Sequence, residues 1–257
     1  MIDDRAPEQK EPPGETPSLE PPAPEPSASE MIAAALGGAA RNAGLDPNSQ
    51  ASTVRVVWTA MGGWRGVVES VVPSLTFVLA FTLTYDPATG TGNLPLSLGL
   101  SVGLALVFTV IRFATKSPPG PALSGLIATV AAAALALLTG RAEDNFLPGF
   151  VTNVVYGSAF LISALIGWSL IGLAVGFLMG EGTAWRKDKR KRRTFFWLAI
   201  SWAGLFAARL AVQVPLYLSG DVAALGTVKL IMGLPLFAPL VAVTWLAVRA
   251  LYPSRKA

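Results

Sequence analysis

Residues 94–113, LPLSLGLSVGLALVFTVIRF, decide the fold class of this chain. They contain a single charged residue, Arg112. A helix of about 20 residues rises about 30 Å, which is the thickness of the hydrocarbon core of a bilayer. Five more stretches have a similar length and composition, at residues 67–85, 121–139, 147–166, 195–218 and 227–250. The sequence therefore predicts an all-α polytopic bundle of six transmembrane helices.

The overall composition supports a membrane protein. Of the 257 residues, 52% are hydrophobic and 14% are charged, and the mean hydropathy is +0.52. A soluble domain of this composition would leave large apolar patches in water. We therefore assign residues 67–252 to one transmembrane domain.

The segment before this domain has a different composition. Residues 1–50 form an acidic, Pro-rich tail, and the first 30 residues carry eight acids against Arg5 and Lys10. Such a segment has too few large apolar side chains to offset the entropy of ordering, so we expect a disordered cytoplasmic tail. Residues 51–66 place apolar side chains at helical spacing, which predicts an interfacial amphipathic helix with Trp58 at headgroup depth.

The Lys and Arg residues are distributed unequally between the loops. Fifteen of them fall on one side of the predicted bundle and two, Arg141 and Lys229, on the other. Cytoplasmic loops carry such an excess of positive charge. We expect both termini in the cytoplasm and the bundle in a bacterial cytoplasmic membrane.

The sequence also excludes several kinds of site. It contains no Cys and no His, which removes thiol nucleophiles, imidazole bases and the usual zinc ligands. It contains no phosphate-binding loop and no dinucleotide fingerprint. We expect no catalytic residues, no cofactor and no metal site, and the protein is not expected to be an enzyme.

Arg209 is the ionisable residue that most needs an explanation, because it lies well inside a predicted span. The predicted topology places seven polar residues in the outer half of the bundle: Arg209, Gln213, Asn153, Tyr156, Asp144, Glu143 and Lys229. One interpretation is an outward-facing cavity that holds an anionic or amphipathic ligand, with Arg209 as its anchor. The other is a buried ion pair of Arg209 with Glu143 or Asp144.

The longest basic cluster follows the fourth predicted span. Its seven members are Arg186, Lys187, Lys189, Arg190, Lys191, Arg192 and Arg193. We interpret them as a determinant of topology and as a contact for anionic lipid headgroups. Nucleic acid is not an expected partner, because no aromatic platform or nucleic-acid-binding motif accompanies the charges.

Four local patterns in the sequence lead to further predictions. Glu69 follows Arg65 by four residues, which predicts an ion pair along one helix. Pro235 and Pro239 should kink the last span. Residues 167–180 are too short for a span, so we expect a helix that is interfacial or partly inserted. Gly172, Gly176 and Gly180 repeat there at four-residue spacing, for packing within the bundle or for a homo-oligomer.

Two segments resemble a known family. GGWRG at 62–66, continued by Glu69 and Ser70, and GRAEDNFLPG at 140–149 resemble uncharacterised actinobacterial membrane proteins, a domain of unknown function, over residues 54–252. The second half is similar, more remotely, to the intracellular septation protein A family. That similarity is carried by Asp144, Phe146, Tyr156, Trp202, Phe206, Gln213 and Lys229.

The resemblance implies an envelope or cell-division associated scaffold or a lipid-interacting protein. Its expected partners are membrane lipids, envelope or division proteins and a second copy of the chain. The residues around Arg209 support an alternative, a small transporter or permease. The sequence leaves both functions open.

Overall fold

The computed structural model describes Arg55, Trp58, residues 63–115 and residues 120–253. The predicted tail at 1–50 and most of the predicted interfacial helix at 51–66 lie outside these residues. The described part of the chain consists of helices and loops, with one isolated bridge between Asp86 and Thr91 in place of a β-sheet.

Among the described residues, six helical segments are long and apolar enough to cross a membrane, which confirms the predicted fold class. Two helices in line, α9 and α10, make up the sixth. The segments are α3 (Gly63–Leu83), α4 (Leu94–Ala114), α5 (Gly120–Thr139), α6 (Leu147–Leu165), α8 (Lys189–Leu218), α9 (Val222–Ile231) and α10 (Leu234–Leu251). Three short helices lie between them: η1 (Ala142–Phe146), α7 (Leu170–Leu178) and η2 (Ala184–Lys187).

Most helix ends lie within a few residues of the predicted ones, and two differ for local reasons. Residues 63–66, which we assigned to a separate interfacial helix, are the first turn of α3. Helix α8 begins six residues earlier than predicted, because the Asp188 side chain accepts hydrogen bonds from the backbone N–H groups of Arg190 and Lys191. Part of the basic cluster is therefore helical.

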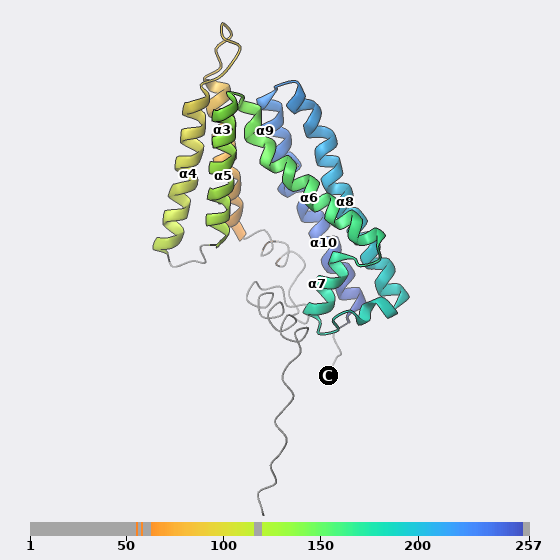
Figure 1. The fold of residues 1–257 in the computed structure, drawn as a ribbon. Helices are drawn as coiled ribbons and strands as arrows, with labels where there is room; N and C mark the ends of the chain where they lie inside the picture. Colours follow the sequence, from red (N-terminus) through yellow and green to blue (C-terminus); the bar gives the residue numbers. More distant parts are fainter. Residues whose placement is uncertain (1–54, 56–57, 59–62, 116–119, 254–257) are drawn as a thin grey trace, which may run out of the picture.

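The spans alternate in direction, so the loops collect at two ends of the bundle (Figure 1). We call one end the basic face, because it carries residues 186–193 together with α7, η2 and the end of α10. The opposite face carries the loop at 84–93, η1 and the turn at 219–221.

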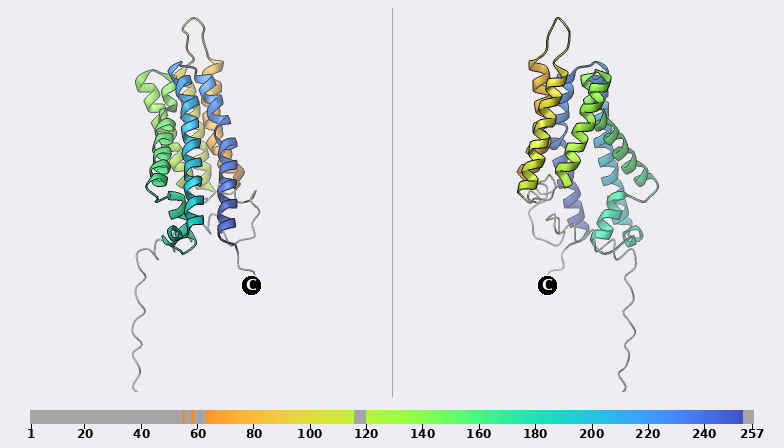
Figure 2. Two further views of the ribbon diagram at one scale, coloured as in Figure 1. Left: turned by 90° about the vertical axis from the view of Figure 1, so that its right-hand side faces the viewer. Right: turned by 60° about the vertical axis from the view of Figure 1, so that its left-hand side comes forward.

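The spans form two groups that meet near the opposite face and diverge toward the basic face (Figures 1 and 2). One group contains α3, α4 and α5, and the other contains α6, α7, α8 and α10. Helix α9 and η1 join them, because α9 packs on α3 and η1 packs on α5. The residues at this junction form an apolar cluster that includes Phe77, Val78, Phe146 and Leu225. We call it the junction cluster.

The sixth span is interrupted as well as kinked. Helix α9 ends at Ile231, and Met232 and Gly233 are not helical. Pro235, in the first turn of α10, has no N–H group to donate to the carbonyl of Ile231, so the hydrogen-bond ladder cannot continue. Pro239 lies inside α10. The sequence located the irregularity, and the structure places a full break before Pro235.

The segment at 167–180 contains α7, which is separate from the spans, as expected. The Ser169 hydroxyl donates to the carbonyl of Phe195 in α8 at 2.9 Å, which ties the start of α7 to the bundle. The fully buried Trp185 packs against Gly172 and Gly176, while Gly180 ends the helix with a φ of 73°. The two helical glycines thus serve packing within the chain, and their close contact with Trp185 removes them as a seam between copies.

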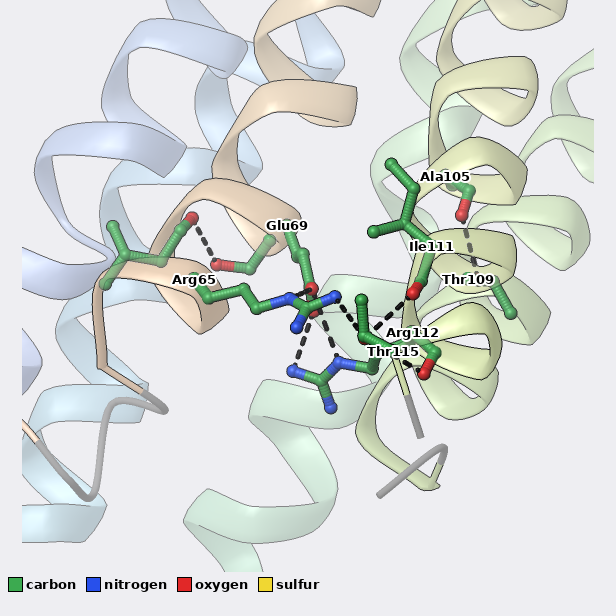
Figure 3. A network of polar contacts seen from close by, with 9 residues as sticks. Arg65, Glu69, Ala105, Thr109, Ile111, Arg112 and Thr115 are labelled. Carbon is green, nitrogen blue, oxygen red and sulfur yellow. Dashed lines mark hydrogen bonds and ion pairs between the residues drawn. The ribbon is translucent and has the colours of Figure 1, made fainter. Parts of the chain in front are cut away.

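An ionic cluster fastens α3 to α4 at the basic face (Figure 3). The predicted Arg65–Glu69 ion pair is present at 2.9 Å, and Arg112 of α4 approaches the same carboxylate at 2.8 Å. Arg65 also donates to the hydroxyl of Thr115 at 3.2 Å. Two guanidinium groups therefore hold Glu69, which fixes the part of α3 that precedes Ser70.

The glycine packing predicts that Gly176→Ala destabilises the protein by about 1–3 kcal/mol. A Cβ at this position would lie 2.2 Å from the carbonyl oxygen of Gly182 and 2.6 Å from Cδ1 of Trp185. Gly99→Ala is the matched control, since nothing lies within 4 Å of its Cβ. Unfolding by SDS titration in mixed micelles measures both variants. Equal stability of the two would contradict the packing role.

The ionic cluster predicts that Glu69→Gln lowers the free energy of unfolding by about 2–3 kcal/mol, because it leaves two arginines side by side in a part-buried site. Glu143→Gln is the control. Its partner Arg141 has a side chain that is 53% exposed, so the loss should stay below about 1 kcal/mol. The same titration measures both, and a larger loss in the control would refute the ranking.

Candidate functional site

A partly open cavity of about 370 Å³ lies between α3, α8, α9 and α10. It is lined by Ser70, Val71, Ser74, Arg209, Lys229, Leu230, Gly233, Leu234 and Phe237. Helix α3 contributes both hydroxyl groups, α8 and α9 contribute one cation each, and the break in the sixth span contributes Gly233. The cavity is therefore built from both groups of helices.

The cationic part of the cavity lies deep in the bundle. Arg209 is nine residues before the end of α8, Lys229 is seven residues after the start of α9, and Ser74 is nine residues before the end of α3. At 1.5 Å per residue, these positions are roughly 10–14 Å below the helix ends at the opposite face. The two charges thus lie within the segments that cross the membrane.

Neither cation has a counter-charge among the described residues. All salt bridges found there involve other side chains, and the Nε atom of Arg209 is buried without a hydrogen-bond partner. The Nζ atom of Lys229 lies over the ring of Phe146, 5.1 Å from its centroid. A cation–π contact of this kind offsets only part of the cost of removing an ammonium group from water. The cavity therefore carries an uncompensated positive charge.

The break in the sixth span places the N-terminal end of α10 in the same wall. Gly233 and Leu234 line the cavity, and they form the N-terminal end of α10. No side chain caps this end. The first N–H groups of a helix have no partner within the helix, and they carry the positive end of its dipole. An anion in the cavity would meet two cations and a helix N-terminus.

The junction cluster closes the cavity toward the opposite face. Phe77 and Leu225 are fully buried there, and a Cβ on Gly226 would lie 2.2 Å from Cγ2 of Val78. Helices α3 and α9 thus approach closely just above Lys229. The sequence interpretation placed the opening of the cavity on this side, where the structure has this close contact between α3 and α9.

The acidic residues predicted near Arg209 have other partners. Asp144 accepts a hydrogen bond from the hydroxyl of Tyr217 at 2.5 Å, and Glu143 pairs with Arg141 at 2.8 Å. The predicted ion pair of Arg209 with Glu143 or Asp144 is therefore not formed. Local pairing at the opposite face holds both carboxylates away from the cavity.

The other predicted site residues are also outside the cavity lining. Asn153 on α6 and Gln213 on α8 are buried, and the Nε2 atom of Gln213 has no hydrogen-bond partner. Tyr156 is 54% exposed and stacks on Phe206 at 5.9 Å between ring centroids. Of the seven predicted residues, the structure brings only Arg209 and Lys229 to the cavity.

Two hydroxyl-bearing residues of the lining were not among the predicted site residues. Ser70 and Ser74 are four residues apart, so both lie on one face of α3. This spacing of two hydroxyl groups in an apolar span was a usable signal.

The basic cluster divides into paired and unpaired cations. Lys191 contacts Glu181 at 2.6 Å, and Arg186 stacks on Trp168 at 4.0 Å. The hydroxyl of Tyr252 donates to Glu181 at 2.8 Å, and burial together with this bond raises the pKa of Tyr252. The remaining five are exposed at the basic face: Lys187, Lys189, Arg190, Arg192 and Arg193.

Comparison with known proteins identifies a matching family model, but it identifies no similar curated protein and no similar solved structure. A search of curated proteins and a search of solved structures each found no match to the chain. The model of one family, described as a protein of unknown function (DUF3159), matches residues 61–255, which include all six spans and the cavity. The chain is therefore a member of the DUF3159 family.

Proposed function

We propose that this protein is a small membrane permease that binds an anion in the cavity between α3, α8, α9 and α10. One observation carries the proposal. Arg209 and Lys229 line a cavity inside the membrane-spanning part, and neither has a counter-charge among the described residues.

A charged side chain inside a membrane is energetically unfavourable unless it has a partner. A single charged side chain at the centre of a membrane helix costs at least about 2.5–3.5 kcal/mol, and ionisable residues there commonly mark ligand or ion pathways. Arg209 keeps its charge at any physiological pH. A bound anion would supply the missing counter-charge, and the hydroxyl of Ser74 could donate a further hydrogen bond to it.

Two features favour a permease over a protein that only binds a ligand. The sixth span is interrupted beside the cavity, and interrupted helices form the substrate sites of many transporters. The cavity is also partly open, and the junction cluster lies between it and the opposite face. Transport across the membrane would require the contact between Val78 and Gly226 to separate.

The distribution of Lys and Arg supports an orientation with the basic face and both termini in the cytoplasm, in a bacterial cytoplasmic membrane. In this orientation, the junction cluster would lie between the cavity and the outside of the cell.

A second candidate is an envelope or cell-division associated scaffold that contacts anionic lipids. The five exposed cations at the basic face favour the lipid contact, because each Lys or Arg near an anionic surface contributes about 1 kcal/mol. The division role has the support of the sequence resemblance alone. This candidate leaves the unpaired cations in the cavity without a role, so we rank it second.

Thermal unfolding of the purified protein with added inorganic phosphate tests the anion site. Phosphate at ten times its dissociation constant should stabilise the native state by about 1.4 kcal/mol. The stabilisation should disappear in Arg209→Gln and in Lys229→Gln. It should persist in Lys187→Gln, which removes an exposed cation at the basic face.

A shift that is the same in wild type, Arg209→Gln and Lys187→Gln would show general screening and would refute the site. Proteoliposomes test the permease itself. Uptake of radiolabelled phosphate or acetate that exceeds the Arg209→Gln background supports transport. Binding without uptake of either anion would contradict it.

A further inference from the structure

The lining of the cavity changes from polar to apolar along the membrane axis. Lys229, Arg209 and Ser74 lie at the end next to the junction cluster. Leu234 and Phe237 follow Lys229 by five and eight residues along the sixth span, which places them roughly 7–12 Å closer to the basic face. The cavity therefore has a cationic end and an apolar end.

The apolar end has a fixed wall. The ring of Phe237 packs edge-on against Trp202 of α8, with 5.0 Å between the ring centroids. Val71 and Ser70 lie at a similar depth on α3, and the Ser70 hydroxyl already donates to the carbonyl of Val67 at 3.0 Å. None of the side chains that line this end is charged.

The size of the cavity exceeds the need of an inorganic anion. Pockets for small organic ligands measure about 300–1,000 Å³ and are mostly apolar, with a few polar groups that fix the orientation. At about 370 Å³, with its charged groups gathered at one end, this cavity fits that description. A simple anion at the cationic end would leave water against Leu234 and Phe237, where few polar groups could hold it.

From this division, and resting on the anion site proposed above, we propose that the ligand is an amphipathic anion. Its carboxylate or phosphate group lies between Arg209 and Lys229, and its aromatic or aliphatic body extends along Leu234 and Phe237 toward the basic face. Such a ligand could come from water as an organic acid or from the membrane as a single-chain lipid.

Three probes of graded chemistry test the inference in lipid nanodiscs: acetate, 3-phenylpropionate and 3-phenylpropanol. They carry the charge alone, the charge with an apolar body, and the body alone. We expect 3-phenylpropionate to bind at least ten times more tightly than either of the others, by calorimetric titration. Phe237→Ala should reduce this preference at least fivefold, whereas Arg209→Gln should abolish the binding of both anions.

Leu246→Ala, at a 52% exposed position of α10, is the matched control and should keep the preference. Because Phe237→Ala also removes a contact with Trp202, Phe237→Leu provides a second variant, and the unfolding temperature without ligand shows whether each variant is folded. Leucine should retain part of the preference.

The outcomes separate this inference from the proposed function. Equal affinity for acetate and 3-phenylpropionate would overturn the amphipathic ligand and leave the anion site standing. Failure of both anions to bind would overturn the anion site as well. If the preference is found, competition by lysophosphatidate in the same nanodiscs assigns the ligand to the membrane, and its absence assigns the ligand to water.

Discussion

The physical constraint on which this account depends is a pair of cations inside the spans, Arg209 and Lys229, that have no counter-charge in the part of the chain that the structure describes. Bringing an acidic side chain to Arg209 and Lys229 would neutralise them, yet each nearby acid is held elsewhere. Asp144 is bound by Tyr217, and Glu143 by Arg141. The acidic residues at the opposite face are thus kept apart from the cations, and this separation is the basis of the anion site that we propose.

The break in the sixth span serves the same site. An uninterrupted helix would satisfy its own backbone groups, as membrane helices normally must. Met232, Gly233 and Pro235 prevent this, and an interrupted helix is tolerated at such depth only where the interruption is buried in protein or lines a cavity. The break lies directly against the two cations. The two cations, the N-terminal end of α10 and the apolar side chains therefore line one cavity. This cavity lies between the two groups of helices, which the junction cluster joins at one end.

The parts of this arrangement that depend on local sequence could be predicted. The spans follow from length and composition, and the Arg65–Glu69 pair follows from its spacing of four. Arg209 stood out because a charge in an apolar run is costly. Depth along the helices correctly brought Lys229 near it, since depth depends only on counting residues from a helix end.

The other predictions about the site depend on which helices pack together and how they are rotated about their axes. Counting residues from a helix end does not give this information. Asn153 and Tyr156 have a suitable depth but belong to α6, which contributes no residue to the cavity lining, and Ser74 lines the cavity because α3 packs on α9. The hydrogen bond of Asp144 with Tyr217 joins residues 73 positions apart, so no local sequence pattern predicts it. The glycine spacing in α7 predicts close packing, but the residue that packs against these glycines is Trp185 of η2.

The most direct measurement of the central claim is a cryo-electron microscopy map of the protein in nanodiscs with an excess of 3-phenylpropionate. The account predicts density for the carboxylate between the guanidinium group of Arg209 and the ammonium group of Lys229. A map in which Asp144, Glu143 or another carboxylate of the chain contacts Arg209, with no ligand density in the cavity, would contradict it.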